Sequence, residues 1–237
     1  MNSTFFVAGA TGYTGREVVR VGHEQGCSVV AHIRPESTSR ERWEGRFSEI
    51  GAEVDLSPWT AEAMAAALEQ AQPSHVFALL GTTRSRASEE EARRGGEVSY
   101  ETVDYGLTKL LLDACTQLSS SPRFVYLSSM GLGAEEPSNA YLNVRWRIEQ
   151  ALREGSVPFT IVRPSFITGP DRDESRPGER IGAAVADGAL TLVGWLGGGR
   201  LRDRYQSLDN TELATAMVRL ALDPTAAGAT VEADGLR

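Results

Sequence analysis

Short apolar runs alternate with longer amphipathic stretches along most of the chain. The short runs predict six strands: Thr4–Ala8, Ser28–Ile33, Ala52–Leu56, His75–Leu80, Phe124–Leu127 and Phe159–Val162. The longer stretches predict helices over Tyr13–Glu24, Ala61–Ala71, Val98–Gln117 and Asn139–Arg153. Alternating strands and helices are typical of a parallel sheet with helices on both faces. We therefore predict an α/β fold, a doubly wound parallel sheet of the Rossmann type.

The pattern loosens in the last third of the chain. Pro164–Gly178 is polar and rich in proline and glycine, and Gly194–Gly199 is again rich in glycine. A helix over Asp209–Leu222 and a strand over Ala229–Glu232 follow. Neither a repeat nor a composition shift divides the chain, so we predict one domain over residues 1–237, with its substrate-side loops mainly in 164–205.

Composition and charge indicate which kinds of partner the protein does not bind. The formal net charge is −8, whereas nucleic-acid-binding surfaces usually carry a basic excess, so we expect no nucleic-acid partner. No stretch approaches the roughly 20 apolar residues of a membrane span, and the N-terminus lacks a basic leader, so we expect no membrane partner and a cytoplasmic location. Cys27 and Cys115 lie far apart, and the three histidines form no paired motif, so no metal site is expected.

A glycine-rich turn directly after the first strand carries the strongest local signal. It runs Gly9-Ala10-Thr11-Gly12-Tyr13-Thr14-Gly15 and opens the first helix. Such a turn lets the backbone approach a pyrophosphate closely, and the helix N-terminus offers N–H groups and a partial positive charge. No Gly-Lys-Ser/Thr closes the turn, which excludes a P-loop. We predict a dinucleotide site formed by Gly9, Thr11, Gly12, Tyr13, Thr14 and Gly15.

The end of the second strand indicates which dinucleotide binds. NAD-binding sites usually place an acidic residue about 20 residues beyond the turn, on the ribose 2′-hydroxyl. Here the strand ends in His32-Ile33-Arg34, with no acid and an arginine at the tip. A guanidinium can bind a 2′-phosphate with its planar fork of donors. We therefore predict NADP(H) as cofactor, with Arg34 on the phosphate and Arg40 or Arg16 as the alternatives.

The chain resembles the atypical short-chain dehydrogenase/reductase superfamily, and within it the Tat-interacting-protein-like oxidoreductases. The resemblance covers nearly the whole chain. Besides the glycine turn, it rests on Leu80–Arg84, Leu127–Gly131, Tyr141–Arg145, Val162–Pro164 and the charged run Asp173–Glu179. It implies that Gly81, Thr82 and Thr83 lie along the cofactor ribose, Asp55 near the adenine, and Pro164 and Ser165 near the nicotinamide.

The resemblance also implies a catalytic group of Ser129, Tyr141 and Arg145, of which Tyr141 and Arg145 also contact the cofactor. A carbonyl that accepts hydride needs a proton donor beside its oxygen and a hydroxyl to hold the developing oxyanion. A tyrosine can donate that proton when a nearby cation stabilises its phenolate. The superfamily's usual cation is a lysine four residues after the tyrosine, whereas this chain has Arg145. Ser128 is the competing serine, and we predict that it contacts the cofactor.

Two functional hypotheses follow from these residues. The first is NADPH-dependent reduction of a small carbonyl or quinone-like substrate. The second is a non-catalytic regulatory or protein-binding module that senses NADP(H), which Arg145 and the branch that the chain resembles both keep open. A kinase activity has been proposed for that branch, but this chain has no kinase motif set. The charged loop 172–180 is either a lid over the nicotinamide or a salt-bridged surface loop. The sequence leaves open the substrate and whether the protein is a monomer or a homodimer.

Overall fold

A parallel sheet forms the centre of the computed structural model, which describes residues 3–81, 100–165, 167–168 and 208–237. Within these ranges its strand order is β3-β2-β1-β4-β5-β6-β9. The bounds are β1 Thr4–Ala8, β2 Ser28–His32, β3 Glu53–Asp55, β4 His75–Ala78, β5 Arg123–Leu127, β6 Phe159–Arg163 and β9 Ala229–Glu232. All neighbouring strands are parallel. The predicted α/β fold with a parallel sheet is confirmed.

Side chains alternate strictly between the two faces of this sheet. In β1, Phe5 and Val7 belong to one core cluster and Phe6 and Ala8 to the other, and all four are fully buried. Successive strand residues point to opposite faces, so a strand covered on both sides is apolar throughout. The register places Phe5 between Val29 of β2 and His75 of β4. The continuous apolar runs in the sequence therefore reflect a sheet that is buried on both sides.

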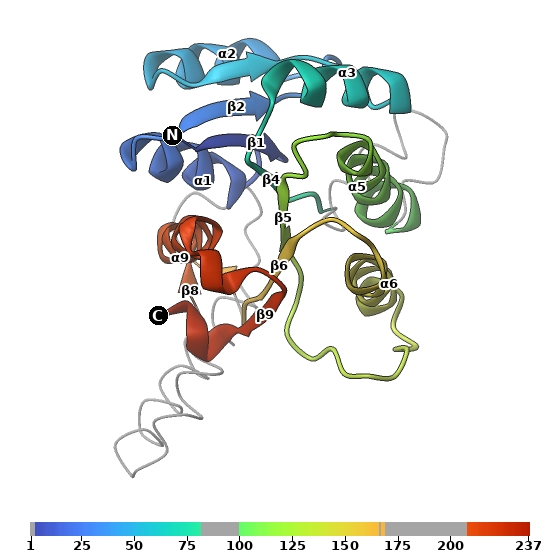
Figure 1. The fold of residues 1–237 in the computed structure, drawn as a ribbon. Coiled ribbons are helices and arrows are strands. Elements are labelled where there is room, and N and C mark those ends of the chain that lie inside the picture. Colours follow the sequence, from blue (N-terminus) through green and yellow to red (C-terminus); the bar gives the residue numbers. More distant parts are fainter. Residues whose placement is uncertain (1–2, 82–99, 166, 169–207) are drawn as a thin grey trace.

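Helices cover the two faces in two layers (Figure 1). On one face lie α1 Gly15–Glu24, α2 Arg40–Glu49 and α9 Asn210–Leu222, and on the other lie α3 Ala61–Ala71, α5 Thr108–Thr116 and α6 Ala140–Glu154. Strand order reverses at β1, which pairs with β2 on one side and β4 on the other. Ligands of open α/β sheets bind at such a switch point, at the carboxyl ends of the strands. The glycine turn follows β1 at this place.

The helix predicted over Val98–Gln117 has two parts in its described portion. It begins as a π-helix, η1 Glu101–Leu107, and continues as α5. The Tyr105 amide donates to the Tyr100 carbonyl at 3.0 Å, which is the i→i+5 spacing of a π-helix. Each such turn holds an extra residue and changes which side chains face inward. In η1 the inward residue is Asp104, only 2% exposed.

Helix α2 was not predicted, because its sequence has no apolar stripe. Only Trp43 and Phe47, four residues apart, are buried. Arg42 and Arg46 place their guanidinium carbons 5.6 and 5.1 Å from the centroid of the Trp43 ring. Two aromatic anchors thus hold a helix whose other residues are mostly charged or polar.

Short elements complete the described chain. β7 Ile167–Thr168 and β8 Leu208–Asp209 pair in parallel as a separate two-stranded sheet. Asp209 caps α9 with a capping box, in which its carboxylate accepts from the Glu212 amide at 2.7 Å. The 3₁₀ turns η2 Pro224–Ala226 and η3 Ala233–Leu236 lie on either side of β9.

Candidate functional site

The glycine turn after β1 is too tight for any larger residue at two positions. Gly9 has φ +85°, and a β-carbon added to it would lie 2.6 Å from the Leu79 carbonyl oxygen. A β-carbon on Gly15 would overlap the Gly9 carbonyl oxygen and lie 2.8 Å from its carbon. The Gly12 amide closes the turn by donating to the Gly9 oxygen at 2.9 Å. This compact backbone fits the close approach that a pyrophosphate requires.

The turn leads directly into the N-terminus of α1. Thr14 precedes the helix, is buried and makes no capping hydrogen bond with its side chain. Asn210, at the start of α9, donates from Nδ2 to the Tyr13 carbonyl at 3.2 Å and fixes the turn from the neighbouring helix. Thr11 is half-buried. The predicted residues Gly9 to Gly15 therefore form one fixed turn beneath a helix terminus that favours anions.

The structure brings Arg34 and Asp55 to the same edge of the sheet. Asp55 ends β3 opposite His32, and the exposed Arg34 follows two residues after His32. The Asp55 carboxylate accepts from the Ser57 hydroxyl at 2.8 Å and from the Ser57 amide at 3.2 Å. His32 donates from Nε2 to the Ser57 carbonyl at 2.9 Å, and burial lowers its pKa. This edge of the sheet thus carries the neutral His32, the Asp55 carboxylate with its two hydrogen bonds from Ser57, and the exposed side chain of Arg34.

Arg145 forms the centre of a buried cluster at the ends of β4 and β5. It is 6% exposed, and it donates from Nη1 to the Leu127 carbonyl at 2.7 Å and from Nη2 to Asp104 Oδ1 at 3.2 Å. Its Cζ lies 4.6 Å from the centroid of the Tyr141 ring. A β-carbon added to Gly81 would lie 3.4 Å from Nη2 and 3.6 Å from Asp104 Oδ1. The guanidinium therefore lies directly against the turn that follows β4.

Electrostatics keep this guanidinium charged. Burial alone would lower the pKa of Arg145, but the neighbouring Tyr126, Tyr141 and Asp104 raise it above its ordinary value. Burial raises the pKa of Tyr126, which therefore stays a neutral phenol. The cluster thus contains the positively charged Arg145 and the buried carboxylate of Asp104. It also contains the Tyr141 ring, which packs edge-on against Tyr100 with ring centroids 5.5 Å apart.

The two candidate serines have different surroundings. Ser128 is buried and donates its hydroxyl to Glu149 Oε1 at 2.6 Å. Ser129 is half-buried, and among the described residues its hydroxyl has no hydrogen bond. This difference favours Ser129 as the serine available to a ligand, while the cofactor contact of Ser128 stays a prediction.

Glu149 holds the loop after β5 in place. Its carboxylate is fully buried and accepts from Arg163 Nη2 at 2.6 Å, from Arg163 Nε at 2.9 Å and from Arg153 Nη2 at 2.8 Å. Burial would raise the pKa of Glu149, but the donors, Arg163 foremost, lower it. Arg163 also donates to the Leu132 carbonyl at 2.9 Å. This network joins α6, β6 and the loop that carries Ser129.

The remaining predicted residues fall partly outside the described ranges. Pro164 and Ser165 follow β6 and are buried, and the Pro164 carbonyl accepts from the Met130 amide at 3.2 Å. This bond holds the ends of β5 and β6 together. Thr82, Thr83 and the charged loop 172–180 lie outside the described residues.

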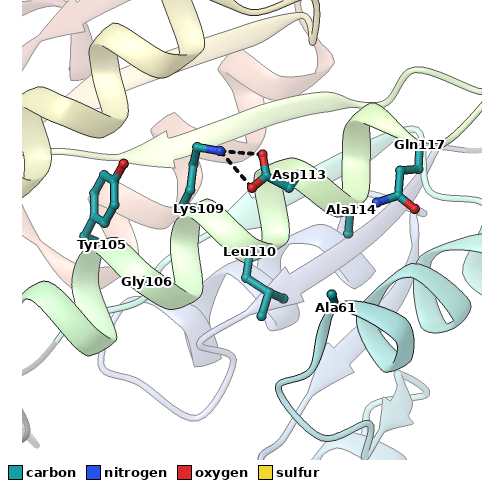
Figure 2. Close-up of a pocket in the computed structure, with 8 residues that line it drawn as sticks. All are labelled: Ala61, Tyr105, Gly106, Lys109, Leu110, Asp113, Ala114 and Gln117. Carbon is teal, nitrogen blue, oxygen red and sulfur yellow. Dashed lines mark hydrogen bonds and ion pairs between the residues drawn. The ribbon is translucent and has the colours of Figure 1, made fainter.

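A separate groove of about 280 Å³ lies along one side of η1 and α5 (Figure 2). It contains none of the predicted site residues, and its charged pair, Lys109 and Asp113, is internally neutralised at 2.6 Å. The predicted cofactor residues of the glycine turn and the Arg145 cluster lie outside this groove. The lining residues are Ala61, Tyr105, Gly106, Lys109, Leu110, Asp113, Ala114 and Gln117.

Comparison with known proteins identifies the family. Residues 9–188 match the family model described as NAD(P)H-binding, and the match begins at the first glycine of the turn. The chain belongs to the NAD(P)H-binding family. The predicted resemblance is thereby confirmed at the level of the superfamily, while its closeness to the Tat-interacting-protein-like branch stays a prediction.

This NAD(P)H-binding chain is similar in sequence to a plant reductase and in fold to proteins solved with NADP+ or NAD. It is 31% identical over 176 residues to the chloroplastic divinyl chlorophyllide a 8-vinyl-reductase of Oryza sativa subsp. indica, covering 69% of this chain but only 40% of that relative's length. Its fold matches AtPrR2 solved with NADP+ and (+)pinoresinol (TM-score 0.67, 17% identity, 98% of this chain and 69% of that one). It also matches a short-chain dehydrogenase/reductase superfamily protein from Agrobacterium tumefaciens with bound NAD (TM-score 0.61, 22% identity, 96% and 76%).

Among the described residues, His, Cys, Asp and Glu side chains do not gather in groups of three or more that could hold a metal ion. In the same part of the chain, no helix has the length and apolar character needed to cross a membrane.

Sequence reasoning on this NAD(P)H-binding chain missed Asp104, Glu149 and Arg163. A signal for one of them was present, because Val144, Ile148 and Leu152 form the inward stripe of α6 and the charged Arg145 and Glu149 lie within it. A charge on an apolar stripe is buried and needs a partner. The stripe could have predicted a buried network, but it could not identify partners from distant elements.

Proposed function

We propose that this chain is an NADP(H)-dependent oxidoreductase that reduces a small carbonyl or quinone-like substrate. The observation that carries the proposal is the Arg145 cluster. A buried cation lies beneath the Tyr141 ring and against Gly81, at the carboxyl ends of β4 and β5. This is the side of the sheet on which the glycine turn lies, so the proton-donating residues and the cofactor turn share one edge.

Each residue has a defined role in this proposal. The glycine turn and the N-terminus of α1 bind the cofactor phosphates, and Arg34 binds the 2′-phosphate. When bound, the nicotinamide supplies the hydride. The Tyr141 hydroxyl donates a proton to the substrate oxygen, and the Ser129 hydroxyl donates a hydrogen bond to the same oxygen. Arg145 places a positive charge against the Tyr141 ring, with Cζ 4.6 Å from its centroid.

The similarity to a named reductase supports an oxidoreductase, while the carbonyl or quinone-like substrate rests on the site residues alone. The rice relative is named as a reductase of a divinyl chlorophyllide, and AtPrR2 was solved with NADP+. Because this chain spans only 40% of the rice protein, its substrate is part of the proposal and is not transferred from that relative.

Binding and turnover together test the proposal. NADPH should stabilise the protein against heat more than NADH at equal concentration, because the tighter ligand stabilises the folded state more, by about 2.7 kcal/mol at one hundred times its dissociation constant. NADPH oxidation should then be measured with a panel of quinones and aldehydes. Equal or absent shifts with the two cofactors would contradict the NADP(H) assignment.

A second candidate function is a non-catalytic NADP(H) sensor. The direct ion pair between Arg145 and Asp104 favours it, because a cation held at 3.2 Å from a carboxylate stabilises a phenolate less than an unpaired one would. NADPH binding without turnover on any carbonyl or quinone would favour this function.

A further inference from the structure

Asp104, the carboxylate that pairs with Arg145, lies in the π-helical turn of η1. Successive residues of an α-helix are rotated by about 100°, so one extra residue in a turn changes the direction of the side chains that follow. Asp104 lies within η1, where the Tyr105 amide bonds five residues back to Tyr100. In the described structure, Asp104 is the one buried acidic residue of η1 and α5, and it lies in the π turn.

Asp104 limits the orientations open to the Arg145 guanidinium. Nη1 is bound to the Leu127 carbonyl and Nη2 to Asp104, while Nε is buried without a hydrogen-bond partner in the described ranges. Two anchors from different elements fix a planar group, whereas one anchor leaves it free to rotate. The orientation matters because the same plane covers the Tyr141 ring, with Cζ 4.6 Å from its centroid.

We propose that Asp104 is a positioning residue, which acts on the cofactor and on Tyr141 through Arg145. It holds the guanidinium flat beneath Tyr141 and against Gly81, and it balances the buried charge. This inference rests on the proposed function, because it assigns a partner to the cation of that site. Asp104 itself need touch neither substrate nor cofactor, since Arg145 lies between it and the Tyr141 ring.

A double-mutant cycle on NADPH affinity tests this role. Asp104→Asn keeps the shape and removes the charge, and Arg145→Met removes the partner. We expect Asp104→Asn to weaken NADPH binding about tenfold in the wild-type background, the loss of one hydrogen bond to a charged group. In the Arg145→Met background the same change should alter affinity less than twofold. Affinity is measured by calorimetry well below the melting temperature of each variant, where a merely structural role would leave it unchanged.

Glu101→Gln is the matched control, because Glu101 lies in the same helix and pairs with Arg147 at 2.8 Å on the surface. It should change NADPH affinity less than twofold in both backgrounds. An Asp104→Asn effect of equal size with and without Arg145, or no effect at all, overturns the positioning role while leaving the proposed function intact. If the wild-type protein binds neither NADPH nor NADH, the proposed function fails and this inference fails with it.

Discussion

At the scale of single residues, the contact between Gly15 and the Gly9 carbonyl leaves no space for a methyl group. Gly15→Ala would force the helix start away from the strand, because the obstacle is backbone that cannot rotate aside. We expect a loss of about 1–3 kcal/mol in unfolding free energy and a loss of NADPH binding. Thermal unfolding and calorimetry measure the two effects.

Gly45→Ala provides the control for this prediction. Gly45 lies inside α2, and a β-carbon there would meet no atom within 4 Å. Replacing a helical glycine by alanine usually stabilises by about 0.5–1 kcal/mol. Equal melting temperatures for the two variants would contradict the steric interpretation of the turn.

Arg34→Ala tests the cofactor preference. Loss of one charge-assisted contact of about 1.5–3 kcal/mol should weaken NADPH binding about ten- to a hundredfold and leave NADH binding nearly unchanged. Arg42→Ala is the control, since Arg42 is an exposed arginine whose guanidinium lies over Trp43. If Arg34→Ala lowers NADPH affinity less than threefold, another residue must bind the 2′-phosphate. Arg40 and Arg16 would then be tested next.

At the scale of elements, α6 is a helix whose buried stripe contains a fully buried carboxylate. Glu149→Gln keeps the size of the side chain but removes the buried anionic partner of Arg163, which keeps only its ion pair with the more exposed Glu232 at 2.8 Å. Removing one member of a buried pair costs about 3–5 kcal/mol of stability. Glu154→Gln, an exposed site at the end of the same helix, should have little effect in the same denaturant titration.

The effect of Glu149→Gln should depend on pH. The pKa of Glu149 is lowered in the folded protein, so its stabilising contribution is complete above the unfolded value of about 4.3 and is lost as the pH falls through the folded value. The difference in stability between wild type and variant should therefore be constant from pH 7 to pH 5 and shrink in stronger acid. A difference that grows on acidification would show that the carboxyl is protonated in the folded state.

The elements also show where sequence reasoning succeeds. The strands and the helices with apolar stripes were predicted because their signal is local, and the glycine turn because its geometry admits few residue types. The helix α2 was missed because two buried aromatic residues make too weak a stripe. The π turn at Asp104 was missed because hydrogen bonds five residues apart leave no composition signal. The Glu149–Arg163 pair joins a helix to the following strand, and only the packed sheet determines that contact.

At the scale of the whole molecule, the buried His32 and the half-buried His75 should make the fold sensitive to mild acid. Burial, with a smaller effect of Arg123, lowers the pKa of His75 to about 4, and burial lowers that of His32. The unfolded chain takes up protons at both below about pH 6.5, whereas the folded chain does not. Stability should thus fall as the pH drops from 6.5 towards 4, before the carboxylates titrate.

His75→Gln should reduce this loss. Its contribution is at most about 2 kcal/mol between pH 6.5 and pH 5, and less to the extent that water screens the charge. Urea unfolding at pH 8, 6.5 and 5 measures the slope for wild type and variant. Parallel curves for the two proteins would show that His75 takes no part in the acid sensitivity.

The pairing of β7 with β8 has a consequence for how such a protein can diversify. Thr168 and Asp209 are register partners, so two positions far apart in the sequence are held side by side. The entropy of closing a loop rises slowly, by about 0.6 kcal/mol for each doubling of its length. A change of chain length between these two anchors would therefore cost little closure entropy. The length of the chain between these anchors is thus a property that evolution or a protein engineer could vary at small entropic cost.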